Sequence, residues 1–244
     1  MFMAVAAEAR KHQELEHKAG GIYIRQFIFG TEDGLIGNLG LITGVSVATL
    51  SPGVVILAGI ALMLTQAVSM SAGTYLSIKS QHEYFDHVLE QEKREIKEIP
   101  DIEREEVRQI YHDHGFRGKD LELLVKKITS NTGAWLSVMM AEEFGLSKKG
   151  LEHPLKASFI MALSVMLGAF IPLLPFFFLA TTPGLMASIF ATIIALFVFG
   201  AAKTSYTTRR WFISGLEMML VGGVAAGAGY LIGSTFQTIF GIVV

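Results

Sequence analysis

Glutamates at helix-face spacing gather in one charged part of the chain. Glu92 and Glu95 are three residues apart, Glu103 and Glu106 are also three apart, and Glu143 follows two methionines by one turn. Because side chains three or four residues apart share a helix face, such helices can present them to a common centre. Carboxylates suit hard divalent cations and thioethers suit softer ones, so a mixed set favours Fe2+ over Mg2+ or Ca2+. The candidate metal ligands are Glu92, Glu95, Glu103, Glu106, Met139, Met140 and Glu143.

Two other interpretations of this charged part stay open. Pairs such as Glu90 with Arg94 are typical of a solvated helix surface, and Met139 with Met140 would also fit an ordinary core. A di-iron oxidase is disfavoured, because no Glu-x-x-His pair occurs between Lys79 and Lys156. The histidines near these helices are therefore interpreted as surface or auxiliary residues.

A second group of polar residues lies in apolar surroundings. Glu32 and Asp33 fall at the start of an uncharged stretch, and Gln66 and Met70 lie within it. Adjacent residues point about 100° apart on a helix, so we expect only one of the two acids to face a pathway. A carboxylate and a thioether would line a route for a transition metal, which pairs Asp33 with Met70 and leaves Glu32 and Gln66 as possible auxiliaries. The alternative places both acids at the headgroup level.

The helices that position these polar residues are expected in long stretches without Asp, Glu, Lys or Arg. They cover residues 34–78, 157–202 and 218–244. A membrane-spanning helix needs about 20 apolar residues, so a soluble globule is excluded. Breaks at Leu50-Ser51-Pro52-Gly53 and Thr181-Thr182-Pro183-Gly184 divide the first two stretches. The predicted spans are 27–50, 54–78, 157–180, 185–202 and 212–242.

The basic residues predict the orientation of these spans. All 20 lysines and arginines lie before or at the start of the first span, between Lys79 and Lys156, or in the loop from Lys203 to Arg210. The positive-inside rule then places the N-terminus and the charged insert in the cytoplasm. The predicted fold is all-α, with a cytoplasmic N-terminal segment at 1–26, spans one and two at 27–78, a cytoplasmic module at 79–156 and spans three to five at 157–244.

The module is predicted to hold three helices. No proline or glycine follows span two, so that helix should continue into the cytoplasm until Ile99-Pro100. A second helix is expected over 102–113 and a third from 119 to about 144, separated by the glycines at 115 and 118.

Close helix packing is predicted from glycines. Gly40 and Gly44 form a small-xxx-small pair in span one, and several glycines line span five. Because five helices enclose a pathway poorly, we expect a homodimer with the route at its two-fold interface. The acid Glu217 is expected to neutralise Arg209 or Arg210 at the interface.

Composition limits the chemistry further. The absence of cysteine excludes thiolate metal sites and cysteine nucleophiles, which leaves oxygen and thioether ligands. A net charge of -2 without a basic stripe gives no sign of nucleic acid binding. We predict no enzyme activity and no prosthetic group, with Fe2+ or Mn2+ as substrate and ligand.

The order of several motifs resembles a known family, the vacuolar iron transporters, which are related to the yeast calcium/manganese vacuolar transporter. The resemblance extends from about Ile24 to Ile232. The motifs are FGTEDGLIGNLGLITGV, AVSMSAGTYLSIKSQ, the acidic insert, MMAEEFGL and HPLKASFIMALSVMLGAFIPLLPFF.

The resemblance implies a dimeric, five-span, proton-coupled exporter of cytosolic Fe2+, often handling Mn2+ as well. It places Asp33 and Met70 on the transport path, and it assigns the same seven ligands to the module. One position departs from the eukaryotic pattern, since Leu62 stands where those members carry a glutamate tied to the path and to proton coupling. Asp33, helped by Glu32, would then carry the coupling, or transport would be less tightly coupled.

The function predicted from the sequence is therefore export of Fe2+, with Mn2+ as a second substrate, by proton antiport. A membrane-anchored metal sensor or storage-linked protein without transport is the alternative. The membrane would be a prokaryotic inner membrane or a vacuolar or other organellar membrane.

Overall fold

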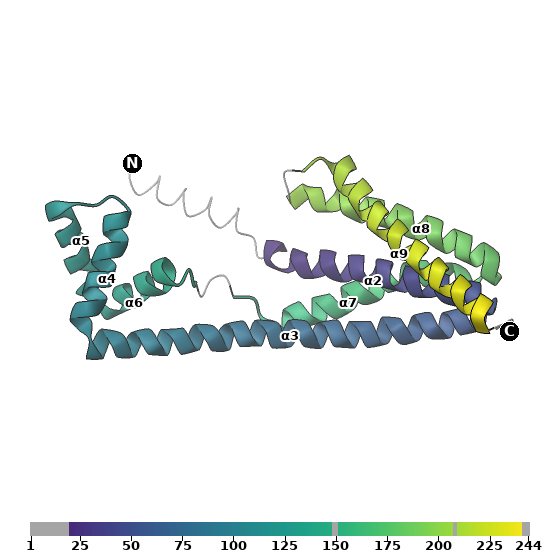
Figure 1. The fold of residues 1–244 in the computed structure, drawn as a ribbon. Helices are drawn as coiled ribbons and strands as arrows, with labels where there is room; N and C mark the ends of the chain where they lie inside the picture. The colour runs from purple at the N-terminus through teal and green to yellow at the C-terminus, as the bar shows by residue number, and fades with distance from the viewer. Residues whose placement is uncertain (1–19, 148–150, 207–208, 241–244) are drawn as a thin grey trace. The chain divides into compact units, whose positions relative to one another are not determined.

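The computed structural model describes residues 20–147, 151–206 and 209–240, and all regular structure in these ranges is helical (Figure 1). The chain divides into two compact units. Leu76–His153 forms the module, and the residues up to Tyr75 together with those from Pro154 form the membrane unit. The all-α prediction is confirmed. The predicted sides of the membrane for 1–26, 27–78, 79–156 and 157–244 stay a prediction.

Five long helices build the membrane unit. They are α2 (Gly20–Thr49), the first part of α3 (Pro52–Glu98), α7 (Pro154–Leu173), α8 (Thr181–Ala202) and α9 (Trp211–Phe240). Among the described residues, α3, α7, α8 and α9 belong to segments long and apolar enough to cross a membrane. The first predicted span lies in α2, which is not among these, so the five-span topology stays a prediction.

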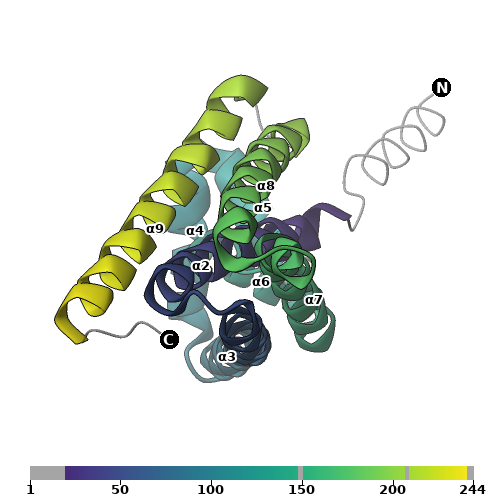
Figure 2. The same cartoon turned by 90° about the vertical axis from the view of Figure 1, so that its right-hand side faces the viewer.

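The polar character of α2 follows from its position in the bundle. It packs against α7, α8 and α9, and Figure 2 shows it among them. Polar side chains on α2 are buried there, and two of them bond within the helix: the Thr31 hydroxyl donates to Phe27 O at 2.8 Å and the Thr43 hydroxyl to Leu39 O at 2.7 Å. A helix enclosed by other helices need not be apolar on every face, which lowers its hydropathy.

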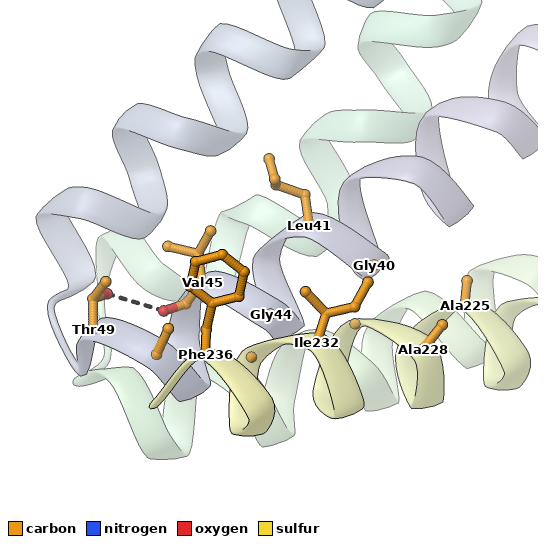
Figure 3. A pocket seen from close by; sticks show the side chains of 12 residues that line it. Gly40, Leu41, Gly44, Val45, Thr49, Ala225, Ala228, Ile232 and Phe236 are labelled. Atoms are coloured by element: carbon orange, nitrogen blue, oxygen red, sulfur yellow. Dashed lines mark hydrogen bonds between the residues drawn. The ribbon is translucent and has the colours of Figure 1, made fainter. Parts of the chain in front are cut away.

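The glycine prediction is confirmed at the contact of α2 with α9. A Cβ atom on Gly44 would lie 3.1 Å from the Gly229 carbonyl oxygen, and one on Gly233 would collide with the backbone of Gly44. Only residues without side chains permit this approach. An apolar cavity of about 510 Å³ borders the contact, lined by residues of the two helices alone (Figure 3).

One of the two predicted turns is wrong. Residues 181–184 form the first turn of α8, because proline is tolerated where helical N–H groups have no partner. The chain instead turns before Thr181, after α7 has given way at Leu173 to a 3-10 turn over Leu174–Phe177. Pro172 and Pro175 account for that early end, seven residues before the predicted one. The other turn is confirmed, and Leu50 there adopts a positive φ of 49°.

The module agrees with two of its three predicted helices. α3 continues without interruption to Glu98, and α4 covers Pro100–Asp113. The prediction of a single helix over 119–144 is wrong. It is divided into α5 (Gly118–Thr129), α6 (Thr132–Val138) and a π-helical turn, Met139–Glu143. Asn131 causes the first break, since its side-chain oxygen caps α6 by accepting from Ala134 N at 3.0 Å.

Candidate metal sites

Two glutamates of the module are buried on neighbouring helices. Glu92 on α3 is 1% exposed and Glu103 on α4 is 2% exposed. Each precedes a buried apolar residue by one turn, Ile96 and Val107 respectively, so the face that forms the core also carries the carboxylate inward. The Oε2 atom of each glutamate has no hydrogen-bond partner in the described part of the chain. Buried polar atoms are normally bonded, so these two require an explanation.

The five predicted glutamates act on one another electrostatically. Burial, followed by repulsion from Glu103, Glu143 and Glu95, raises the pKa of Glu92 to about 8. Burial and then the charges of Glu106, Glu95 and Glu143 raise the pKa of Glu103 to about 7. The pKa of Glu143 is raised by burial and by Glu106 and Glu95. The fold therefore gathers like charges whose ionised state lacks compensation among the described residues, a condition that a cation relieves.

The side chains as placed do not form a coordination shell. Within the described ranges, no three His, Asp or Glu side chains stand close enough together to hold one ion. The glutamates lie close enough to influence one another's charge, but in this arrangement they do not converge on a single ion. Their assignment as metal ligands stays a prediction.

The two methionines of the predicted ligand set lie in separate apolar clusters. Met139 packs with Ile96, Val107 and Trp135, whereas Met140 packs with Phe85 and Val88. As placed, both fit the core interpretation that the sequence left open. They begin the π-helical turn that ends at Glu143, and such turns are frequent at functional sites.

In the membrane unit, the structure brings Asp33 of α2 together with Gln66 of α3. The Gln66 Nε2 amide donates a short hydrogen bond to Asp33 Oδ2, and it lies 3.4 Å from the Asp33 carbonyl oxygen. Gly37 leaves room for this amide, since a Cβ atom there would lie 3.0 Å from Nε2. Because the nitrogen faces the carboxylate, the orientation of the amide is fixed and its Oε1 points elsewhere. That oxygen is buried, and no partner for it is described.

The remaining predicted path residues lie nearby on the same helices. Met70 follows Gln66 by one turn of α3 and packs against a buried cluster of Ala67, Met161 and Val165. Glu32 is half-buried on α2, adjacent to Asp33 but on another face of the helix. Leu62 is half-buried one turn before Gln66.

Sequence reasoning missed the buried asparagine of α2. Asn38 is 0% exposed, and its Nδ2 donates to the Ala169 carbonyl oxygen of α7 at 2.6 Å. Its Oδ1 has no described partner. The available signal was an asparagine inside a stretch without charged residues, where a polar side chain needs a bonding partner in the protein.

The predicted ion pair at the start of α9 is confirmed. Arg209 Nη1 lies 2.8 Å from Glu217 Oε2 and 3.0 Å from Oε1, and both side chains are largely exposed. This acid is therefore compensated by a cation, whereas the partner described for the Asp33 carboxylate is the neutral Gln66 amide.

The chain matches the model of the VIT family over residues 24–234. The chain belongs to the VIT family. It is 33% identical to vacuolar iron transporter 1 of Arabidopsis thaliana, with 93% of this chain and 91% of that protein covered. It is 34% identical to vacuolar iron transporter 1 of Eucalyptus grandis, covering 93% and 92%, and 30% identical to the vacuolar iron transporter of Plasmodium berghei, covering 93% and 87%.

VIT family membership confirms the resemblance read from the motifs. The match begins within four residues of the start of α2 and runs into α9, so it includes both units and both groups of polar residues. Together with the four apolar helices, it identifies the chain as an integral membrane protein of a transporter family.

Proposed function

We propose that this VIT family protein carries Fe2+ out of the cytosol across its membrane, with Mn2+ as a second substrate. The observation that carries this proposal is the Asp33 carboxylate, placed between α2 and α3 and bonded by the neutral Gln66 amide. A charged residue at the bilayer centre costs about 2.5 to 3.5 kcal/mol on insertion scales. A membrane anchor does not need such a residue, whereas a pathway for cations does need one. The relatives named above are vacuolar iron transporters.

Capture of the ion is assigned to the module. Its buried glutamates repel one another, so a divalent cation gains from binding there and its local concentration rises. Glu92 and Glu103 must release protons before they bind metal, because burial and neighbouring charges raise both pKa values. The proposed ligands remain Glu92, Glu95, Glu103, Glu106, Met139, Met140 and Glu143.

Passage through the membrane is assigned to Asp33 and Met70. The ion replaces the Gln66 amide as the partner of the Asp33 carboxylate. The thioether of Met70 is a second ligand of the ion. Protonation of Asp33 from the far side then releases the ion, which makes transport an antiport with protons. Since Leu62 cannot take up a proton, Asp33 carries the coupling, with Glu32 as the second acid on the same helix.

The remaining parts of the proposal concern topology and assembly. The protein has five spans with the N-terminus and module in the cytoplasm, and it acts as a homodimer. The names of its relatives favour a vacuolar or other organellar membrane. No prosthetic group and no nucleic acid takes part.

A metal sensor or storage-linked protein is the second candidate. The buried glutamates of the module favour it, because metal binding alone would account for them. It does not account for Asp33, which lies outside the module.

Flux into proteoliposomes tests the proposal. The purified full chain should move Fe2+ and Mn2+ in preference to Zn2+ and Ca2+, and an opposing proton gradient should accelerate the flux. Metal binding without flux would establish the sensor. Fe2+ flux indifferent to the proton gradient would remove antiport from the proposal and leave transport.

A further inference from the structure

A second thioether lies beside the turn of α2 that carries Asp33. Met161 of α7 is 5% exposed, and its sulfur would lie 3.1 Å from a Cβ atom on Gly30. Gly30 precedes Asp33 by three residues, so the two positions are neighbours on the helix surface. The sulfur of Met161 therefore packs against the backbone of α2 one turn from the carboxylate.

Met70 approaches the same place from a different helix. It packs against the cluster that Met161 forms with Ala67 and Val165. Ala67 directly follows Gln66, so this cluster borders the residue that bonds Asp33. Sulfur atoms from α3 and α7 thus belong to one cluster beside a single carboxylate.

An oxygen without a partner lies in the same region. Gln66 Oε1 is buried and has no described hydrogen-bond partner, and the bond from Nε2 to Asp33 fixes its direction. The region therefore offers the Asp33 carboxylate, the Gln66 amide oxygen and the thioethers of Met70 and Met161, drawn from α2, α3 and α7. Methionine also serves as a flexible core filler, and that use alone predicts no dependence on the identity of the metal.

We infer that the Met161 thioether is a further ligand of the transported ion and sets the preference for Fe2+ over Mn2+. This inference rests on the proposed function and names a specificity residue within it. Thioether sulfur favours softer cations, and Mn2+ is held mainly by oxygen ligands and binds less tightly than Fe2+ to a given site. Removing one sulfur should then weaken the handling of Fe2+ more than that of Mn2+.

The test replaces Met161 by leucine and measures both metals. Leucine keeps nearly the same apolar volume, so M161L should fold with a small loss of stability. We expect the Fe2+-to-Mn2+ ratio of initial flux in proteoliposomes to fall about tenfold, equivalent to about 1.4 kcal/mol. Met218→Leu is the matched control, because Met218 is also buried but belongs to a separate cluster with Leu35 and Leu196. The control should keep the wild-type ratio.

Competition binding separates failure of this inference from failure of transport. Fe2+ and Mn2+ compete for the full chain carrying Glu103→Gln and Glu106→Gln, with and without M161L, so that weakened module binding exposes the membrane site. A lowered Fe2+ preference supports the inference even if the wild type moves no metal. Unchanged preference, or an equal loss for both metals, overturns it and leaves Met161 as a packing residue.

Discussion

The module and the membrane unit hold their carboxylates under opposite conditions. In the module, burial and neighbouring carboxylates raise the pKa values of Glu92, Glu103 and Glu143. Glu92 and Glu103 each keep one buried oxygen without a hydrogen-bond partner among the described residues. In the membrane unit, Asp33 is bonded by a neutral amide across two helices. A crowded acidic cluster attracts cations strongly, whereas a single carboxylate binds one ion and can release it.

This difference indicates a division of labour within one chain. Burial and mutual repulsion make the metal-free module sensitive to protons and to cations. The Asp33 and Gln66 pair instead gives a charged group a partner without cancelling its charge, which suits a site that binds and releases ions repeatedly. The predictions below separate these two roles, from the largest expected effect to the smallest.

Replacing Asp33 by alanine should reduce Fe2+ flux to background. The substitution removes the charge from the membrane unit but leaves the glutamates of the module unchanged, so equilibrium Fe2+ binding to the full chain should be retained. Flux into proteoliposomes and binding in detergent measure the two properties. Glu217→Gln is the control acid, paired with Arg209 in the same unit, and it should keep its flux. Loss of both properties in D33A would contradict the division.

Replacing Glu103 and Glu106 together by glutamine should weaken metal binding by at least roughly 10- to 100-fold, the scale found when residues that only support metal ligands are replaced. Flux at low Fe2+ should fall with it, while the maximal rate at saturating Fe2+ persists. Titration of the purified chain gives the binding constant. The matched control is Glu105→Gln with Glu122→Gln, two exposed glutamates that pair with Arg108. Equal effects in the two double variants would show that the overall negative charge of the module attracts the metal, and that Glu103 and Glu106 form no specific site.

The metal-free module should lose stability as the pH rises from 5 to 8.5. Since the folded-state pKa values of Glu92 and Glu103 are raised to about 8 and about 7, folding favours their protonated forms. Their stabilising contribution is fully present below the ordinary pKa of about 4.5 and is lost as the pH passes through 7 and 8. By the same linkage, metal binding should release protons and strengthen with pH over this window.

Tryptophan fluorescence measures this dependence in the full chain. Trp135 is buried in the module and Trp211 lies in the membrane unit, so Trp211→Phe leaves a reporter of module unfolding. The variant with Glu92→Gln and Glu103→Gln should show a flatter profile. A metal-free module that becomes more stable toward pH 8.5 would refute the proposed cause.

The ion pair of Arg209 with Glu217 should matter least. Both side chains are largely exposed, and exposed pairs contribute about 0 to 1 kcal/mol. Arg209→Gln should therefore shift the melting temperature of the membrane unit only slightly and leave Fe2+ flux unchanged. Thermal unfolding at low and high salt measures the effect.

The sequence predicted the fold where the signal was local and strong. Charge-free stretches gave the apolar helices, and the absence of a breaker after residue 78 gave the continuous α3. It failed where neighbouring residues decide the outcome: the cap at Asn131 divided one predicted helix, and Pro183 proved compatible with a helix start.

The candidate sites were predictable in part for the same reason. Helix-face spacing selected glutamates that the fold does gather. Spacing could not reveal that Met139 and Met140 enter different apolar clusters, nor that Met161 of α7 lies beside α2. Those facts depend on packing between helices distant in the sequence.

The concentration dependence of Fe2+ flux tests the central claim most directly. Initial rates are measured over a range of Fe2+ in proteoliposomes holding equal amounts of wild type, Asp33→Asn and the double variant of Glu103 and Glu106. We predict that Asp33→Asn abolishes the maximal rate, whereas the double variant reaches the wild-type maximum at a higher Fe2+ concentration. Flux through Asp33→Asn at the wild-type rate would contradict the account.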